Sequence, residues 1–136
     1  MRSILPLSLL LLSGLLPAQN CGTLSSTGGA AGTTLAINVA GAPANGFAVL
    51  VVGQNAGSTT VPLPMGGSLV LGIDSPILPL PLGRTDANGA VSLSVDIPAG
   101  LTQQFTVQAQ AAVLTYTLMP FALNACAGNV IPITIG

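Results

Sequence analysis

The stretch RTDANGAVSLSVDIPAG, from Arg84 to Gly100, contains the most regular alternation in the chain. Its apolar positions are Val91, Leu93, Val95 and Ile97, and the intervening polar positions are Ser92, Ser94 and Asp96. A period of two places the two sets on opposite faces of a β-strand. The preceding DANG segment suits a tight turn, because Asp86 can accept backbone hydrogen bonds while Asn88 and Gly89 tolerate positive φ. We therefore predict a turn followed by a half-buried strand.

Other segments on both sides of this stretch also have strand character. They cover residues 33–39, 47–53, 68–74, 78–85, 104–113, 116–123 and 130–135, with Gly, Pro or Asn between them. Residues 47–53 (FAVLVVG) are apolar on both faces, which predicts a central, covered strand. Residues 78–85 (LPLPLGRT) contain prolines that cannot donate to a ladder, which predicts an edge strand or an extended crossing segment. We expect an all-β, antiparallel, immunoglobulin-like β-sandwich of about seven to eight short strands.

The N-terminal residues 1–18 have the pattern of a secretory signal peptide. Arg2 provides a positive n-region, residues 4–16 are apolar, and Ala18 is a small residue suited to cleavage. The apolar run is shorter than the roughly 20 residues that span a bilayer as a helix. We expect no transmembrane segment in the mature chain, a flexible N-terminal segment over residues 19–32, a sandwich domain over residues 33–136, and a Gly-flanked loop over residues 53–67.

Charged residues make up 4% of the chain, against about 25% in an ordinary soluble domain. Outside the predicted signal peptide the charged residues are one arginine, Arg84, and three aspartates, Asp74, Asp86 and Asp96. The mature chain therefore has a net charge of −2. One arginine without lysine cannot neutralise a line of phosphates or anionic lipid head groups, so nucleic acid and electrostatic membrane binding are excluded. Low net charge favours self-association or attachment to a surface.

The residue inventory also argues against catalysis, and we predict no catalytic residue, no metal ligand and no cofactor. A nucleophilic serine or cysteine needs a neighbouring base, and the chain contains no His, Lys or Glu. Zinc lacks ligands for the same reason. Asp86 and Asn88 resemble the opening of a calcium loop, but the closing glutamate is missing, so we favour a turn. We interpret Asp74 as a strand-end cap, and Asp96 as a solvated residue or a cross-strand partner of Arg84.

Cys21 and Cys126 are the two cysteines of the chain. In an exported protein an even number of cysteines favours a disulfide, so we predict a Cys21–Cys126 bond that holds the N-terminal segment against the sandwich. The alternative is two separate thiols.

The segments FAVLVVG, SLVLGID, LPLPLGRTDANGAVSLSVDIPAGL, FTVQAQAAV and ALNACAGNVIPITIG occur in that order along the chain. Together they resemble the small, uncharacterised β-sandwich domains at the C-termini of secreted planctomycete-type bacterial proteins. The resemblance covers nearly the whole mature chain and rests on turn and core residues. It implies an extracellular, disulfide-tolerant, non-catalytic module, and it provides no catalytic residues to carry over.

These observations predict a secreted protein, located outside the cell, at the cell surface or in the periplasm. We expect a structural or interaction role in the bacterial cell envelope or extracellular matrix, with a second copy or another envelope protein as the partner. The alternative is a carbohydrate-binding module with a glycan partner. Its polar Asn, Gln, Thr and Ser side chains suit that role, but the chain has no tryptophan for stacking on sugar rings.

Overall fold

The computed structural model describes residues 21–64 and 67–136, and these residues form β-strands without a helix. The strands are β1 (Thr23–Thr27), β2 (Thr34–Ala40), β3 (Phe47–Gly53), β4 (Ala56–Pro62), β5 (Ser68–Ile73), β6 (Leu78–Arg84), β7 (Val91–Asp96), β8 (Phe105–Leu118) and β9 (Phe121–Ile135). The strand pairs are antiparallel, so the predicted all-β class is confirmed. The predicted signal peptide, residues 1–18, lies outside the described residues.

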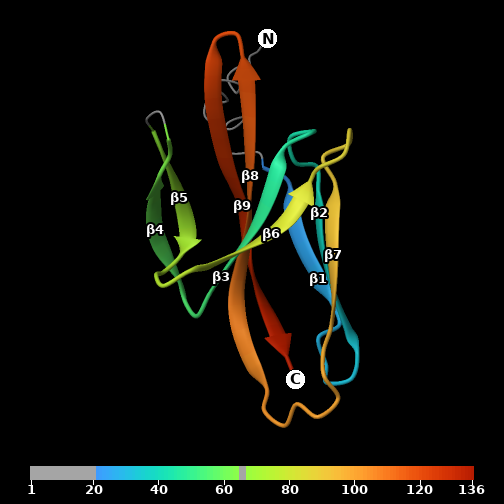
Figure 1. Cartoon of the computed structure of the whole chain (residues 1–136). Helices are drawn as coiled ribbons and strands as arrows, with labels where there is room; N and C mark the ends of the chain where they lie inside the picture. The colour runs from blue at the N-terminus through green and yellow to red at the C-terminus, as the bar shows by residue number, and fades with distance from the viewer. Residues whose placement is uncertain (1–20, 65–66) are drawn as a thin grey trace, which may run out of the picture.

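The strands form two larger sheets and a separate hairpin (Figure 1). One sheet has the order β1-β2-β7, the other has the order β6-β3-β8-β9, and β4 pairs with β5. The main core lies between the two larger sheets: Leu35 and Ile37 come from the first, and Leu50, Ala109 and Ile133 come from the second. Each sheet therefore buries its apolar face against the other.

Strand β3 is covered on both faces, as its sequence predicts. Ala48 and Leu50 belong to the core between the sheets, whereas Val51 packs with Leu71 and Ile73 in a second core beneath the β4–β5 hairpin. Strand β6 lies at the edge of its sheet. An edge position tolerates prolines because the outward backbone groups need no ladder partner. The predictions of a central β3 and an edge β6 are confirmed.

Strands β8 and β9 form a long hairpin whose turn projects beyond the two sheets (Figure 1). A β-bulge interrupts its ladder, because Gly128 and Asn129 of β9 stand opposite the single residue Ala111 of β8. A bulge leaves one residue outside the ladder and turns nearby side chains in new directions.

Three sequence predictions need correction. Residues 19–32 are not simply a flexible segment, because they contain β1, which pairs with β2 over its whole length. Strand β1 buries one large apolar side chain, Leu24, so its sequence has no apolar period. Residues 53–67 contain β4, a largely exposed Ser/Thr strand that the sequence presents as a loop. Residues 116–123 are the end of β8, a turn and the start of β9, and the described residues hold nine strands in all.

Candidate functional site

The segment around Asp86 is a turn held together by its own side chain. One carboxylate oxygen, Oδ1, accepts hydrogen bonds from the backbone N–H of Asn88 at 2.8 Å and of Ala90 at 3.0 Å. The N–H of Ala90 and then that of Asn88 stabilise the ionised carboxylate, so the pKa of Asp86 lies below its ordinary value. Gly89 adopts a φ of 74°, which favours glycine. The structure thus places Asp86, Asn88 and Gly89 in one turn.

The other two carboxylates also contact nearby groups of the fold. Asp74 directly follows β5, and its Oδ1 accepts a hydrogen bond from the N–H of Ser58 on β4 at 2.9 Å. Asp96 ends β7, and its carboxylate accepts a hydrogen bond from the Thr34 hydroxyl of β2 at 3.0 Å. Each aspartate thus has a local structural partner.

Within residues 21–64 and 67–136, the side chains of Asp, Glu, His and Cys nowhere gather in threes that would hold a metal ion. Asp74 lies between β5 and β6, Asp86 lies between β6 and β7, and Asp96 is the last residue of β7.

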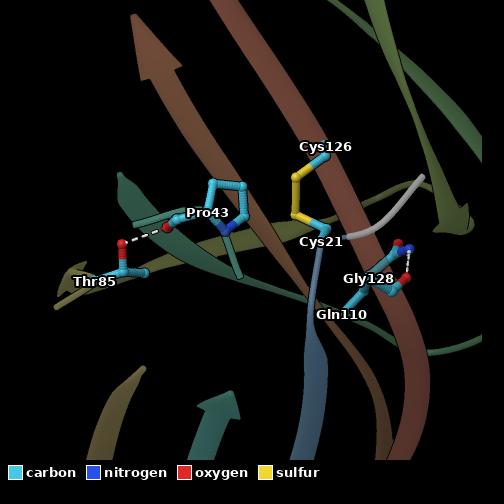
Figure 2. The surroundings of a disulfide bond; sticks show 6 residues. All are labelled: Cys21, Pro43, Thr85, Gln110, Cys126 and Gly128. Carbon is cyan, nitrogen blue, oxygen red and sulfur yellow. Dashed lines mark hydrogen bonds between the residues drawn. A yellow bond between two sulfur atoms is a disulfide. The ribbon is translucent and has the colours of Figure 1, made fainter. Parts of the chain in front are cut away.

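A disulfide joins Cys21, just before β1, to Cys126 of β9 (Figure 2). The two Cα atoms lie 5.5 Å apart, and Cys21 is almost fully buried. The bond therefore connects the three-stranded sheet to the four-stranded sheet. This is the pairing that the sequence predicts.

Asn129 makes a second connection between the same two strands. Its Oδ1 accepts a hydrogen bond from the N–H of Leu24 at 2.8 Å, and its Nδ2 donates to the Leu24 carbonyl at 3.2 Å. The side chain thus pairs with β1 as a neighbouring strand would. The bulge at Asn129 allows this, because the residue stands outside the β8–β9 ladder.

Gln110 of β8 is a buried amide, 5% exposed, that connects three elements. Its Oε1 accepts a hydrogen bond from the N–H of Gly72 on β5 at 2.8 Å, and its Nε2 donates to the carbonyl of Gly128 on β9 at 2.7 Å. Figure 2 shows the contact with Gly128. Both backbone groups lie where a strand ladder is irregular. The amide supplies the hydrogen bonds that the ladders omit there.

Thr85 is a buried polar residue beside the Asp86 turn. Its hydroxyl donates to the Pro43 carbonyl at 2.7 Å (Figure 2) and accepts from the N–H of Gly46 at 2.8 Å. Sequence reasoning singled out none of Thr85, Gln110 and Asn129. The hydrogen-bond partners of Thr85 lie 39 to 42 residues away in sequence, those of Gln110 lie 18 to 38 residues away, and that of Asn129 lies 105 residues away. No local sequence pattern therefore marks these residues.

An apolar groove of about 310 Å³ opens between the two larger sheets. We call it the intersheet groove; its lining residues are Leu35, Ile37, Leu50, Val52, Leu78, Leu80, Leu93, Val95, Ile97, Phe105, Val107, Ile133 and Ile135. None of these described residues is polar. Leu78, Leu80, Val95 and Phe105 are between 37% and 57% exposed, and we call these four the rim. The core is therefore open on this side, where β6 and β7 are edge strands.

The far part of the β8–β9 hairpin, residues 114–125, is a second apolar surface, which we call the arm. Its pairing places Leu114, Tyr116, Leu118, Phe121, Leu123 and Ala125 on one face and Thr115, Thr117, Ala122 and Asn124 on the other. The rings of Tyr116 and Phe121 pack with their centroids 6.5 Å apart. Tyr116, Leu118, Met119 and Phe121 are 50% to 94% exposed. The arm is thus amphipathic, with a strongly apolar tip.

A shallow depression of about 340 Å³ lies beside the Asp86 turn. Its lining residues are Asn38, Val39, Ala40, Asp86, Ala90, Val91 and Ser92. Three of these described residues are polar, and none is aromatic. A sugar would find hydrogen-bond partners there but no ring on which to stack.

Comparison of the chain with protein-family models, curated proteins and solved structures finds no match. Residues 21–64 and 67–136 contain no helix that is long and apolar enough to cross a membrane.

Proposed function

We propose that the chain is a secreted, non-catalytic β-sandwich module with a structural or interaction role in the bacterial cell envelope or extracellular matrix. The observation that carries this proposal is the distribution of exposed apolar side chains. Ten large hydrophobic residues are exposed in the described chain, and eight of them belong to the rim or the arm. Contiguous exposed apolar surface of this kind is typical of interaction sites.

A non-catalytic role agrees with the polar groups. Asp74, Asp86 and Asp96 each accept hydrogen bonds from neighbouring strands or turns. The buried amide of Gln110 is occupied by backbone groups. A catalytic site instead brings a nucleophile, a base and a stabilising group together around one cavity.

The fold that we propose for this module is immunoglobulin-like. In such sandwiches strands A, B and E share one sheet, while G, F and C share the other and an added strand can extend it beyond C. The orders β1-β2-β7 and β9-β8-β3-β6 correspond to A-B-E and G-F-C with one added strand. The β4–β5 hairpin is then an insertion after strand C. Membership of the planctomycete-type domains belongs to the same proposal.

Secretion is supported by the Cys21–Cys126 disulfide, because such bonds persist in oxidising compartments. Fractionation of the producing cells tests this, combined with a thiol reagent applied to each denatured fraction before reduction. We expect the protein in the envelope or the medium without a reactive thiol. A cytosolic protein with two reactive thiols would contradict the proposal. Glycan-array binding by a protein that stays monomeric would instead favour the carbohydrate-binding alternative.

A further inference from the structure

Two apolar surfaces of the described chain have no intramolecular partner: the intersheet groove and the arm. The arm projects beyond the two larger sheets (Figure 1), whereas the groove lies between them. The groove includes Phe105 and Ile135, at the open end of the β8–β9 hairpin, whereas the arm is its closed end. One copy therefore presents an apolar projection at one end and an apolar opening toward the other.

We propose that the arm of one copy inserts its tip, Leu118, Met119 and Phe121, into the intersheet groove of a second copy. This inference rests on the proposed function and deepens it, because it names the partner and both contact surfaces. The tip and the groove are different surfaces, and in this proposal each copy uses them toward two different neighbours, so the contact is heterologous. Such contacts repeat head to tail and produce a ring or an open chain of subunits.

The backbone at the tip suits an apolar environment. Pro120 has no N–H group, and its carbonyl accepts a hydrogen bond from the Thr117 hydroxyl at 3.0 Å. Burial of a backbone group without a hydrogen bond is costly. A turn whose proline carbonyl already has a partner leaves fewer groups to desolvate, and Met119 at its apex is 94% exposed.

The charge distribution favours a second copy over other partners. The sequence from Ile97 to Gly136, which includes the whole arm, contains no charged residue. The described lining of the groove is entirely apolar. No like charges oppose the contact between them, and the single arginine of the mature chain, Arg84, offers little attraction for anionic lipids or nucleic acid.

The dimensions also agree. The groove volume of about 310 Å³ lies at the lower end of the roughly 300–1,000 Å³ of small-molecule pockets, which is room for several aliphatic side chains. The four rim residues and the four exposed arm residues leave on average about 100 Å² uncovered, or about 800 Å² together. That total is below the roughly 1,200–2,000 Å² of stable specific interfaces and falls in the range of transient contacts, so we expect a weak, concentration-dependent association.

Sedimentation velocity of residues 19–136, from about 10 μM to about 1 mM, tests the contact directly. This chain keeps both cysteines and all strands of the described fold. The tip variant is Leu118→Ser with Met119→Ser, and the groove variant is Leu78→Ser with Leu80→Ser on the exposed edge strand β6. Val70→Ser is the matched control, because Val70 is exposed but lies outside both surfaces. Circular dichroism melting curves establish that each variant is folded.

We expect the wild type and the control to form oligomers that grow with concentration, and each double variant to weaken self-association at least about tenfold. A mixture of the tip variant and the groove variant is the decisive sample. The first retains an intact groove and the second an intact tip, so the mixture forms a complex that stops at two chains.

Three outcomes would overturn the contact. If the tip variant associates more weakly but the groove variant associates as strongly as the wild type, the contact is arm to arm. Association that neither double variant weakens would leave self-association, and with it the proposed function, but would place the interface elsewhere. A wild type that stays monomeric at every concentration would exclude the contact. If that monomer floated with neutral phosphatidylcholine vesicles, the arm would be a lipid anchor, and if it cross-linked to another envelope protein, the proposed function would still stand.

Discussion

Replacement of Gln110 by leucine tests whether one buried amide holds the β4–β5 hairpin and the bulge of β9 in place. Leucine keeps most of the side-chain volume but removes both hydrogen bonds. It leaves the N–H of Gly72 and the carbonyl of Gly128 without the partners that they have at 2.8 and 2.7 Å. The change therefore isolates the hydrogen bonds from the packing.

The expected loss follows from those two backbone groups. A buried polar group left without a partner costs about 1–3 kcal/mol. Both bonds are only partly buried, so we expect the lower half of that range for each group and a total loss of about 2–4 kcal/mol. Against a typical domain stability of about 5–15 kcal/mol this is a large fraction. The melting temperature should fall by roughly 8–16 °C.

Urea unfolding followed by far-UV circular dichroism measures this loss as a lower midpoint with an unchanged m-value. Gln108→Leu is the matched control, because Gln108 is a half-buried residue of the same strand that undergoes the same chemical change. We also expect faster hydrogen exchange at the N–H of Gly72 in the Gln110 variant. If Gln110→Leu stays within about 0.5 kcal/mol of the control, the amide does not hold these elements together.

Three further predictions concern the disulfide, the Asp86 turn and its glycine. Cys21 and Cys126 are 105 residues apart in sequence, so replacement of both by serine should lower the free energy of unfolding by about 4–5 kcal/mol in denaturant titrations; an unchanged midpoint would contradict this. Because the pKa of Asp86 is lowered in the folded state, its contribution to stability is present above the unfolded pKa and is lost as the pH falls through the folded pKa. The loss of stability below about pH 4 should therefore be smaller in Asp86→Asn, and equal acid profiles would refute the role of the carboxylate. Gly89→Ala should destabilise more than Gly41→Ala in thermal melts, because both glycines have φ 74° but only at Gly89 would a Cβ collide with backbone; equal losses would contradict the close approach.

The parts of the fold that the sequence predicts are those with a local cause. The alternation in β7 arises from one strand with a core face and a solvent face. The apolar residues on both faces of β3 reflect its two cores, and the prolines of β6 favour an edge strand or an extended crossing segment over a central strand. The Asp86 turn is likewise contained within five consecutive residues. Each of these features can be seen in a short window of sequence.

The parts that the sequence does not predict depend on distant partners. Strand β1 is ordered by its ladder with β2 and by the side chain of Asn129, although it has little apolar character of its own. Strand β4 is a polar strand that pairs only with β5 among the described strands. The bulge at Gly128 and Asn129, which directs two of the polar contacts, has no signal in the single sequence beyond a glycine. The intersheet groove opens where the edge strands β6 and β7 of the two larger sheets lie, so no single segment of the sequence predicts it.

Cross-linking of intact producing cells with a membrane-impermeant reagent, followed by mass spectrometry, measures whether the protein is an interaction module outside the cytoplasm. We expect the protein to be captured there in covalent complexes with further copies of itself or with another envelope protein. Copies joined through the arm and the rim of the groove would agree with both proposals. A protein recovered only as an uncross-linked monomer, or protected inside the cytoplasm, would contradict the claim that it is an interaction module of the envelope or matrix.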